Sequence, residues 1–468
     1  MRGRLRSGVM IVAVVAAACA TVLTGAGGAL AGTHVAIGAQ PAALGGTWGT
    51  AEQIPGTTAG SVFSVSCPTA GYCTAGGGDT DGAFAARELN GTWQSAVQIP
   101  GVAADAGQVN SLSCRTAGNC TAGGEYVSGP DQSQAFVADE VKGKWQTSIE
   151  VPGIATLDQG PFADVGSVSC GAAGDCSAGG YYTDSSGTRQ AFVADEVAGT
   201  WQDAFELPGT ALAGGDWVES VSCPAVGDCT AGGQGGSAGA FVADEVKGIW
   251  QAAIPVPGIA ALEDSFAQTA SVSCAAVGYC TAGGSYTNGG STSEPFVASE
   301  VKGTWQDAIE LPGIAALGPG AEILSVSCAA AGDCSAGGGY TVNLGAPAQQ
   351  QAFVASEVKG TWQDAIEVPR TATLNQGVDA VVNSVSCGAV GNCGVGGYYT
   401  AKNDFTEAFV TDEVDGRWRD AITVPDSAHL NKSFAQTLSV SCAAAGNCTA
   451  GGHVDPGEQE PFVANETS

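Results

Sequence analysis

Sixteen of the seventeen cysteines fall into eight pairs, and five residues separate the two cysteines of every pair. The pairs are Cys67 with Cys73, Cys114 with Cys120, Cys170 with Cys176, Cys223 with Cys229, Cys274 with Cys280, Cys328 with Cys334, Cys387 with Cys393, and Cys442 with Cys448. They recur about every 52 residues, which is close to the repeat length of propeller blades. This periodicity restricts the fold strongly, because a unit of this size cannot bury a core alone and must stack on its neighbours.

We predict that each cysteine pair forms a local disulfide. An even number of regularly spaced cysteines in an exported chain is typical of a disulfide framework. Zinc binding is the alternative, but zinc sites use shorter spacings and often histidine, and the chain holds three His. Five intervening residues can form a hairpin tip that brings two β-carbons within bridging distance, about 3.5–4.5 Å.

Four short segments of each repeat have the composition of strands. In the third repeat they are 167–170 (Ser-Val-Ser-Cys), 176–180, 191–197 and 201–208. A two-residue turn such as Asn90-Gly91, Lys142-Gly143 or Asp415-Gly416 joins the third segment to the fourth and is typical of a tight hairpin. Because no helical period is present, each unit is predicted to be a four-stranded antiparallel meander.

The two ends of the repeat array are out of phase. The array begins with a lone fourth strand, 47–55, and ends with a third strand, 461–466. The first fragment can complete the last unit and close a ring without exposed edges. We therefore predict an all-β fold over residues 46–468: an eight-bladed β-propeller of four-stranded antiparallel blades, closed by the N-terminal strand.

The first 31 residues have the features of a secretory signal peptide. A basic start (Arg2, Arg4, Arg6) precedes an apolar run, and 29–31 (Ala-Leu-Ala) is a small-x-small cleavage site. A retained membrane anchor is the alternative, and Cys19 only loosely resembles a lipoprotein site. Residues 32–45 are predicted to be a linker. No later stretch has the roughly 20 apolar residues that span a bilayer. We predict a secreted or cell-surface protein whose mature chain has no membrane span.

The net charge of −30 excludes some partners. Such an acidic chain repels phosphate backbones and anionic lipid, so nucleic acid and membrane surfaces are not expected to bind it.

The repeat resembles known propeller families. The stretches AGGYY (178–182), QAFVADEV (190–197) and TWQDAIEVP (361–369) resemble a kelch blade, with paired glycines ending its second strand and a Trp in its fourth. They are also similar to extracellular repeats named for a His-Ala-Phe motif. The Trp hairpin is similar to that of eight-bladed quinoprotein dehydrogenases, but their adjacent Cys-Cys pair is absent. The resemblances imply a propeller and no particular activity, and the disulfide in every blade departs from kelch.

Residues that recur in every unit are interpreted as structural. The recurrent glutamates are Glu88, Glu140, Glu196, Glu245, Glu300, Glu357, Glu413 and Glu466. The recurrent tryptophans are Trp48, Trp93, Trp145, Trp201, Trp250, Trp305, Trp362 and Trp418. We expect each Glu to accept hydrogen bonds inside its own blade, rather than to bind calcium or serve acid–base chemistry. We expect the Trp rings to pack between blades, and paired glycines such as Gly179-Gly180 to let blades approach closely.

Two connections vary in length and mark the candidate binding face. The Gly-Gly to Phe connection has 6 to 14 residues and the Pro to Cys connection 11 to 17. An antiparallel meander places both at one end of the blades and the disulfide tips at the other. Variable loops on a rigid frame often bind ligands, so we expect binding on the variable face and not on the disulfide face. The candidate ligand-binding residues are Trp217 (the one Trp outside the repeat), Asp216, Glu219, Tyr182, Tyr399 and His453.

Motifs for catalysis are lacking. No G-x-S-x-G elbow is present, and we assign no catalytic residue, metal or cofactor. We favour a monomeric binding module for a glycan or a protein. The alternative is an extracellular glycan-active hydrolase or lyase with an acidic site at the axial end of the variable face. A convergent cluster of Asp and Glu in one pocket would favour the enzyme, and a broad aromatic surface would favour binding.

Overall fold

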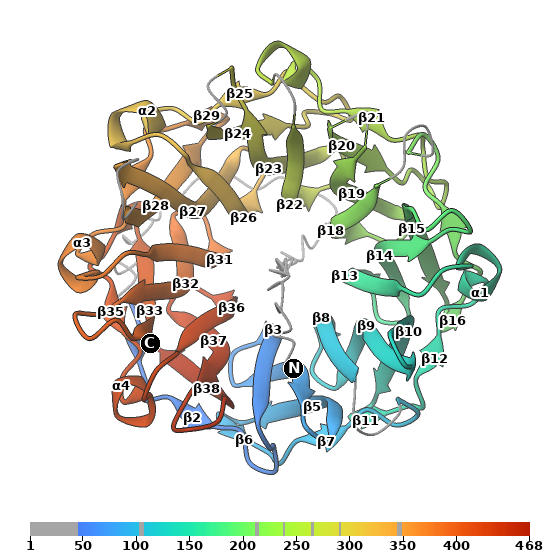
Figure 1. Cartoon of the computed structure of the whole chain (residues 1–468), viewed down its shortest axis with the longest axis horizontal. Helices are drawn as coiled ribbons and strands as arrows, with labels where there is room; N and C mark the ends of the chain where they lie inside the picture. The colour runs from blue at the N-terminus through green and yellow to red at the C-terminus, as the bar shows by residue number, and fades with distance from the viewer. Residues whose placement is uncertain are drawn as a thin grey trace, which may run out of the picture.

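Eight antiparallel sheets surround a central axis as the blades of a propeller (Figure 1). The computed structural model describes residues 45–102, 107–210, 215–236, 239–263, 266–289, 292–343 and 349–468. The predicted signal peptide, 1–31, and the predicted linker up to residue 44 lie outside the described residues. The prediction of eight four-stranded blades is confirmed.

Each blade begins with its innermost strand and proceeds outward. Blade 1 has β3 (Gly60–Thr69), β4 (Tyr72–Asp79), β5 (Gly82–Leu89), β6 (Thr92–Trp93) and β7 (Val97–Gln98). Blade 2 has β8 (Gly107–Thr116), β9 (Asn119–Gly129), β10 (Gln132–Val141), β11 (Lys144–Trp145) and β12 (Ile149–Glu150). Blade 3 has β13 (Ala163–Ala172), β14 (Asp175–Thr183), β15 (Arg189–Val197), β16 (Thr200–Trp201) and β17 (Phe205–Glu206). Blade 4 has β18 (Trp217–Ala225), β19 (Asp228–Gly235), β20 (Gly239–Asp244) and β21 (Ile254–Pro255).

The second half of the ring repeats this order. Blade 5 has β22 (Ala267–Ala276), β23 (Tyr279–Thr287), β24 (Ser293–Ser299) and β25 (Ile309–Glu310). Blade 6 has β26 (Glu322–Ala330), β27 (Asp333–Asn343), β28 (Gln349–Val358), β29 (Thr361–Trp362) and β30 (Ile366–Glu367). Blade 7 has β31 (Ala380–Ala389), β32 (Asn392–Thr400), β33 (Thr406–Val414), β34 (Arg417–Trp418) and β35 (Ile422–Thr423). Blade 8 has β36 (Gln436–Ala444), β37 (Asn447–Val454) and β38 (Glu460–Thr467), completed by β1 (Thr47–Trp48) and β2 (Glu52–Gln53).

The N-terminal strand closes the ring, as predicted. Trp48 pairs with Glu466, and Gln53 pairs with Phe462, both in antiparallel register. Strands from the two ends of the described chain therefore form one sheet, in which β38 has neighbours on both sides.

The prediction of eight local disulfides is confirmed, and each joins the inner two strands of one blade. In chain order, Cys67 bonds to Cys73, Cys114 to Cys120, Cys170 to Cys176, Cys223 to Cys229, Cys274 to Cys280, Cys328 to Cys334, Cys387 to Cys393, and Cys442 to Cys448. The Cα–Cα distances run from 3.8 Å in blade 3 to 4.1 Å in blade 1. The sulfurs therefore cross-link the start of every blade at the hairpin tip.

The tight turns lie at the same end of the blades as the disulfides. In blade 1, Gly91 N of the tight turn donates a hydrogen bond to Gly71 O of the disulfide loop at 3.1 Å. We call this end the turn face and the opposite end, with both variable connections, the loop face.

The structure corrects two predictions about local structure. The fourth strand is not continuous, because its middle turns away and Ala96 N bonds to Pro55 O of the preceding blade at 2.7 Å. The chain also forms one-turn helices in the Pro to Cys connections, although no helical period is visible in the sequence. They are α1 (Ile154–Leu157), η1 (Ile259–Ala261), α2 (Ile314–Leu317), α3 (Thr371–Leu374) and α4 (Ser427–Leu430). A single turn is too short to leave a periodic pattern.

The repeated Ser-x-Ser of the inner strand joins each blade to the next. A propeller's innermost strand has a sheet partner on one side only, so its other edge carries unpaired N–H groups. Ser167 and Ser169 of blade 3 accept from the backbone N–H groups of Val221 and Cys223 of blade 4, each at 2.9 Å. Equivalent bonds cross every seam between blades. These hydroxyls form a continuous ring of hydrogen bonds around the axis.

The tryptophans pack in the seams, as predicted. Trp201, in blade 3, is 7% exposed, and its Nε1 donates to Asp139 Oδ2 of blade 2 at 3.2 Å. The first glycine of each pair allows this close packing, since a Cβ on Gly179 would lie 2.5 Å from the Val218 side chain of blade 4. This seam thus combines close-packed apolar contacts with a buried Trp–Asp bond.

The recurrent glutamates do not bind only within their own blades, so that prediction needs correction. Glu88 accepts from Cys73 N in its own blade, but also from Asn465 Nδ2 of blade 8 at 2.6 Å. Glu413 accepts from Ser356 Oγ of blade 6 at 2.8 Å. These carboxyl groups lie beside the seam, where the preceding blade supplies some of their partners.

None of the helices in the described residues is long and apolar enough to cross a membrane.

Candidate functional site

A β-bulge at the loop-face end of each inner strand creates a ring of variable residues around the axis. In blade 4 the register shifts between Val218 and Ser220, so Glu219 is the extra residue. The same shift occurs in the other seven blades. The extra residues are Phe63, Asn110, Gly166, Glu219, Ala270, Leu324, Asn383 and Leu438. The Ser-x-Ser that follows does not vary, so this position is where the inner strands differ from blade to blade.

A buried carboxyl group of blade 3 lies beside this ring and contacts its blade 2 member, Asn110. Asp164, the second residue of β13, is 2% exposed. Its Oδ1 accepts from Asn110 Nδ2 at 2.6 Å, and the same amide nitrogen lies 3.2 Å from Val165 O. Burial raises the pKa of Asp164 well above its ordinary value, and the nearby Glu125 and Glu219 raise it further. The Asn110 side chain thus holds an acid whose proton is retained more readily than usual.

Blade 4 supplies a second carboxyl group, joined to the one tryptophan outside the repeat. Trp217 Nε1 donates to Glu219 Oε2 at 2.7 Å, and both side chains are partly exposed. Burial raises the pKa of Glu219 to about 7, although the indole bond opposes the shift. The hydrogen bond fixes the indole beside an acid that titrates near neutral pH.

Arg189 lies between two aromatic rings next to these acids. Its Cζ is 4.4 Å from the centre of the Tyr181 ring and 6.0 Å from that of Trp217. Arg189 is exposed, whereas Tyr181 is buried and its pKa is raised to about 12, mainly by burial. The Arg189 carbonyl also accepts from Asp216 N at 3.1 Å, which positions the start of β18. An exposed cation is therefore held against aromatic surface on the loop face.

Together, seven residues from blades 2 to 4 form what we call the axial cluster: Asn110, Glu125, Asp164, Tyr181, Arg189, Trp217 and Glu219. Glu125 links the cluster to an open cavity of about 420 Å³ between blades 1 and 2. Ser61, Phe63 and Gln108 of the inner strands line the same cavity. The cluster offers carboxyl and amide hydrogen-bonding groups, an aromatic surface and one cation, and its Glu125 lines the adjoining cavity.

Two of the predicted residues, Trp217 and Glu219, are in direct contact in this cluster. Asp216 precedes them, but its side chain is 0% exposed and accepts from Gly236 N, so it fixes the backbone of blade 4. Tyr182 is 3% exposed in the core of blade 3, and its hydroxyl donates to Glu206 Oε2 at 3.0 Å.

The structure places the last two predicted residues away from blade 4. Tyr399 is 6% exposed in blade 7, bonds to Thr423 Oγ1 at 2.6 Å and lines a shallow hollow of about 520 Å³. His453 is 4% exposed in blade 8, across the ring from blade 4. It stacks on Phe434 with ring centres 5.0 Å apart, and its Nδ1 lies 3.3 Å from Ser61 Oγ. Burial lowers the pKa of His453 to about 4.

Sequence reasoning missed Asp164, Asn110, Arg189 and Glu125. A usable signal was present, because Asn110 and Asp164 stand just before the invariant Ser-x-Ser, at positions that change from blade to blade. Nothing in the sequence places Arg189 against Tyr181, since a variable loop separates them.

Within the described ranges, no group of three or more His, Cys, Asp or Glu is arranged to hold a metal ion.

Comparisons with known proteins agree with the fold. No family model and no curated protein sequence matches the chain. Sqt1 from Chaetomium thermophilum, solved bound to the N-terminus of the ribosomal protein L10, is similar with a TM-score of 0.51 at 10% identity, over 89% of this chain and 98% of that chain. The WD40 domain of SCAP from fission yeast has a TM-score of 0.44 at 10% identity, over 90% and 98%. A PL25 ulvan lyase has a TM-score of 0.44 at 12% identity, over 75% and 91%. At 10% identity, the similarity to Sqt1 shows the fold alone.

Proposed function

We propose that the protein is an extracellular binding module for glycans and that the ligand binds the loop face at the axial cluster. The observation that carries this proposal is the Trp217–Glu219 pair, an indole that is partly exposed and fixed by a 2.7 Å hydrogen bond beside a carboxyl group. Sugar rings stack on aromatic faces and exchange hydrogen bonds with carboxyl and amide groups. The axial cluster combines these groups with Arg189.

The proposal includes the location of the protein. Eight disulfides are typical of proteins in an oxidising compartment. We propose that residues 1–31 are removed on export and that the mature chain acts as a monomer, secreted or held at the cell surface. We also propose that its blades are related to kelch-like and His-Ala-Phe extracellular repeats.

A glycan array of the secreted chain, followed by calorimetry on the strongest hit, tests the binding. Trp217→Ala is expected to reduce affinity at least tenfold, while Lys302→Ala, in a tight turn on the turn face, leaves it unchanged. Equal affinity of Trp217→Ala and the parent would exclude the axial cluster as the site. If the array shows no glycan binding, the ligand class is wrong, and a pull-down of protein partners is the next measurement.

A glycan-active enzyme is the second candidate, and one observation favours it. Asp164 and Glu219 are two neighbouring acids with raised pKa values, and a protonated carboxyl group near neutral pH is what a general acid requires. Two neighbouring acids are one part of the arrangement, a cluster of Asp and Glu in one pocket, that would favour an enzyme over a simple binding surface.

The Glu219→Gln variant separates the two functions. It keeps the hydrogen bond from Trp217 but cannot donate an ionisable proton. If the protein is an enzyme, product formation from the bound glycan should fall at least a hundredfold while binding remains. If the parent releases no sugar or unsaturated product from any glycan that it binds, the enzyme candidate is excluded.

A further inference from the structure

Half of the seams between blades contain the same buried hydrogen bond on the side of the turn face. In four described seams, the Trp of one blade donates from Nε1 to the Asp that precedes the recurrent Glu in the preceding blade. The pairs are Trp48–Asp412, Trp201–Asp139, Trp250–Asp195 and Trp305–Asp244, at 3.0 to 3.2 Å. In these seams a carboxylate therefore fills the space beneath the indole and accepts a hydrogen bond from its N–H group.

The seam between blades 5 and 6 lacks this carboxylate. Ser299 stands at the Asp position, and Trp362 Nε1 has no hydrogen-bond partner among the described residues although the residue is 8% exposed. Glu357 Oε2 is also without a partner in the described part of the chain, and Glu357 is 5% exposed. A serine alone does not cause this, because Ser356 in the next seam accepts from Trp418 Nε1 at 3.1 Å. Buried polar atoms of this kind ordinarily have a partner. Among the described residues, unpartnered indole nitrogens also occur in two other seams and unpartnered Glu oxygens in several, so the case for a ligand between blades 5 and 6 rests on the cavity beside these atoms.

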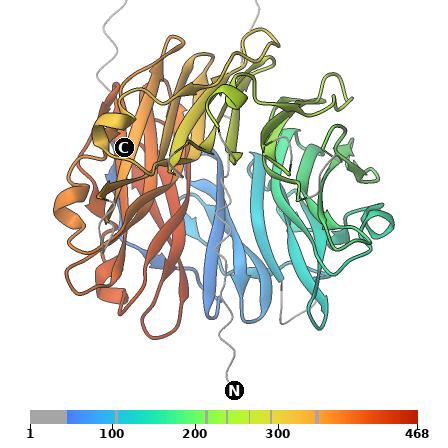
Figure 2. The same ribbon diagram turned by 45° about the horizontal axis from the view of Figure 1, so that its top comes forward.

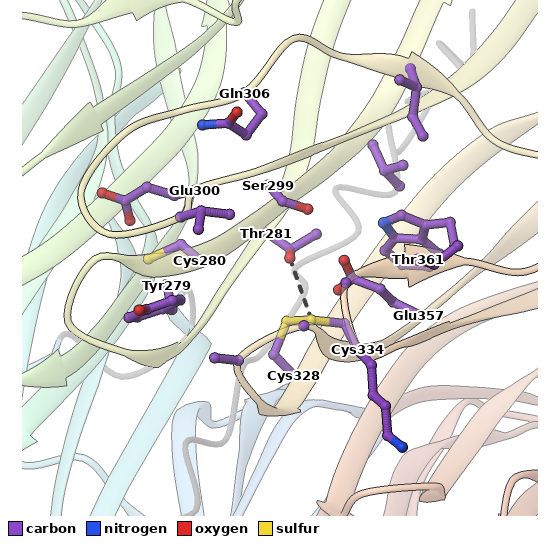
Figure 3. A pocket seen from close by; sticks show the side chains of 18 of the residues that line it. Tyr279, Cys280, Thr281, Ser299, Glu300, Gln306, Cys328, Cys334, Glu357 and Thr361 are labelled. Carbon is purple, nitrogen blue, oxygen red and sulfur yellow. Dashed lines mark hydrogen bonds between the residues drawn. A yellow bond between two sulfur atoms is a disulfide. The ribbon is translucent and has the colours of Figure 1, made fainter.

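An open cavity of about 590 Å³ occupies this seam. Figure 3 shows Ser299 and Glu300 from blade 5 on one side of it and Glu357 from blade 6 on the other. Trp362 is part of its lining. The unpartnered indole nitrogen and carboxyl oxygen both belong to residues that line a space large enough for a small molecule.

The seam between blades 1 and 2 shows what a different side chain does at the same position. Arg87 replaces the Asp there, its Nε lies 3.2 Å from Glu140 Oε1, and the corresponding hollow measures about 290 Å³. Trp145, which corresponds to Trp362, also has an Nε1 without a partner among the described residues. The long arginine side chain therefore occupies space that remains open where the position holds a serine.

We propose that the cavity between blades 5 and 6 binds a small apolar carboxylic acid. Its carboxylate accepts a hydrogen bond from Trp362 Nε1, as an aspartate does in the four seams with a Trp–Asp bond. The wall of the cavity suits an apolar body, because Val297, Ile309 and Pro312 line it beside the indole. The bound molecule would provide the acceptor that Ser299 does not, and its apolar part would leave water on entering the cavity.

Glu357 is compatible with a bound carboxylate. Burial, with a smaller effect of Asp333, raises its pKa to about 7 against a hydrogen bond from Ser299, so at mildly acidic pH the group holds a proton that it can donate to the ligand. The other titratable groups nearby are Tyr279, Glu300, Asp307, Asp333 and Lys359. In the sibling seams an Asp likewise lies near a buried Glu, for example Asp139 near Glu196. We therefore expect binding to be measured best near pH 6.

The test uses phenylacetate and its neutral analogue phenylacetamide, titrated into the disulfide-bonded chain at pH 6 and followed by calorimetry. Phenylacetate is expected to bind at one site, at least tenfold more tightly than phenylacetamide. Ser299→Asp supplies the missing carboxylate from the protein itself, so it is expected to abolish binding and to melt no lower than the parent. Ser356→Asp is the matched control, because Trp418 already has a partner, and it is expected to leave binding unchanged.

Two further variants keep the test decisive. If Ser299→Asp does not fold, Ser299→Asn places a neutral acceptor in the same slot and is also expected to abolish binding. Trp362→Phe keeps the ring but removes the donor, and is expected to remove the preference for the acid. Absence of phenylacetate binding, or binding that persists in the Ser299 variants, would overturn the proposal. So would equal binding of the acid and the amide.

Discussion

The inner strands of the eight blades have the same residues at one end and different residues at the other. At the turn end, Ser-x-Ser is the same in every blade and its hydroxyls bond to the next blade, as Ser169 does to Cys223 N at 2.9 Å. At the loop end, the bulge residue ranges from Phe63 to Glu219. The turn end contacts the same strand segment of the next blade in each seam, so the same Ser-x-Ser hydrogen bonds form in all eight seams. At the loop end the contacts differ between blades: Asn110 bonds to Asp164 of the next blade, whereas Glu219 bonds to Trp217 of its own.

The largest effect is expected from breaking the ring itself (Figure 2). Deleting residues 45–56 removes β1 and β2, including Trp48, from blade 8 and exposes the edge of β38. We expect aggregation and loss of the cooperative melting transition, measured by size-exclusion chromatography and circular dichroism. Deletion of 32–44, which leaves both strands, is the control. A deletion variant with the melting temperature of the parent would contradict closure by this strand.

The next effect concerns carboxyl groups buried at the turn end. Burial raises the pKa to about 8 for Glu196 and Glu245, and to about 7 for Glu300, Glu357 and Glu466. Because these folded-state values lie above the unfolded value near 4.5, the folded protein binds more protons between about pH 4.5 and 8. The free energy of unfolding should therefore fall as pH rises through this window. We expect a lower melting temperature at pH 9 than at pH 5.

Glutamine variants test the origin of this pH dependence. Glu196→Gln and Glu245→Gln remove two groups that titrate in the window, so the melting temperature of the double variant should change less between pH 5 and pH 9. An unchanged slope would mean that other groups cause the effect.

A third prediction compares the stability cost of removing one tryptophan of the seams, Trp201, with that of removing Trp217 at the loop end. Trp201→Ala leaves a cavity between blades 2 and 3 and an unpaired Asp139, so it should cost about 3–5 kcal/mol of unfolding free energy. Trp217→Ala removes a partly exposed ring and should cost less than about 1 kcal/mol. Urea unfolding followed by circular dichroism measures both. Equal costs would show that Trp217 is structural.

The smallest effect concerns the serine ring. Ser167→Ala or Ser169→Ala leaves the N–H of Val221 or Cys223 buried without its acceptor, at a cost of about 1–3 kcal/mol. Ser186→Ala, at an exposed hydroxyl in the loop of the same blade, should change stability by less than about 0.5 kcal/mol. If the inner-strand variants are as stable as this control, the ring of hydrogen bonds contributes nothing measurable.

Repetition made the fold predictable. The Cys spacing, the four strand-like segments of each repeat and the phase difference between the two ends of the array predicted the blades, the disulfides and the pairing of 47–55 with 461–466. The split fourth strand was not predictable, because it depends on Ala96 bonding to Pro55 of another blade. The role of Ser-x-Ser was also invisible, since its partners are backbone groups about 50 residues away in the sequence.

The site was predictable only where a residue departs from the repeat. Trp217 stood out as the Trp that the repeat does not need, and Glu219 followed from its position beside it. Tyr182 and Tyr399 follow Gly-Gly near the loop-face ends of β14 and β32, but their rings fill blade cores. Asp164 and Arg189 belong to the cluster through contacts between blades, which depend on how the ring closes. Ser299 departs from the commonest residue at its position, Asp, by one letter and shares this change with Ser356. The consequence of the change is visible only beside Trp362.

The pairing of Thr47 with Thr467 has a consequence for the order in which the protein is made. Translation produces β1 and β2 first, and the strand that pairs with them last. Blades 1 to 7 each use strands that are contiguous in the chain, but blade 8 uses strands from both ends, so it stays incomplete until residue 467 is available. A chain that ends before β38 therefore keeps both ends of its blade array unpaired. The pairing of β1 and β2 with β38 therefore makes completion of the chain a condition for completion of the fold.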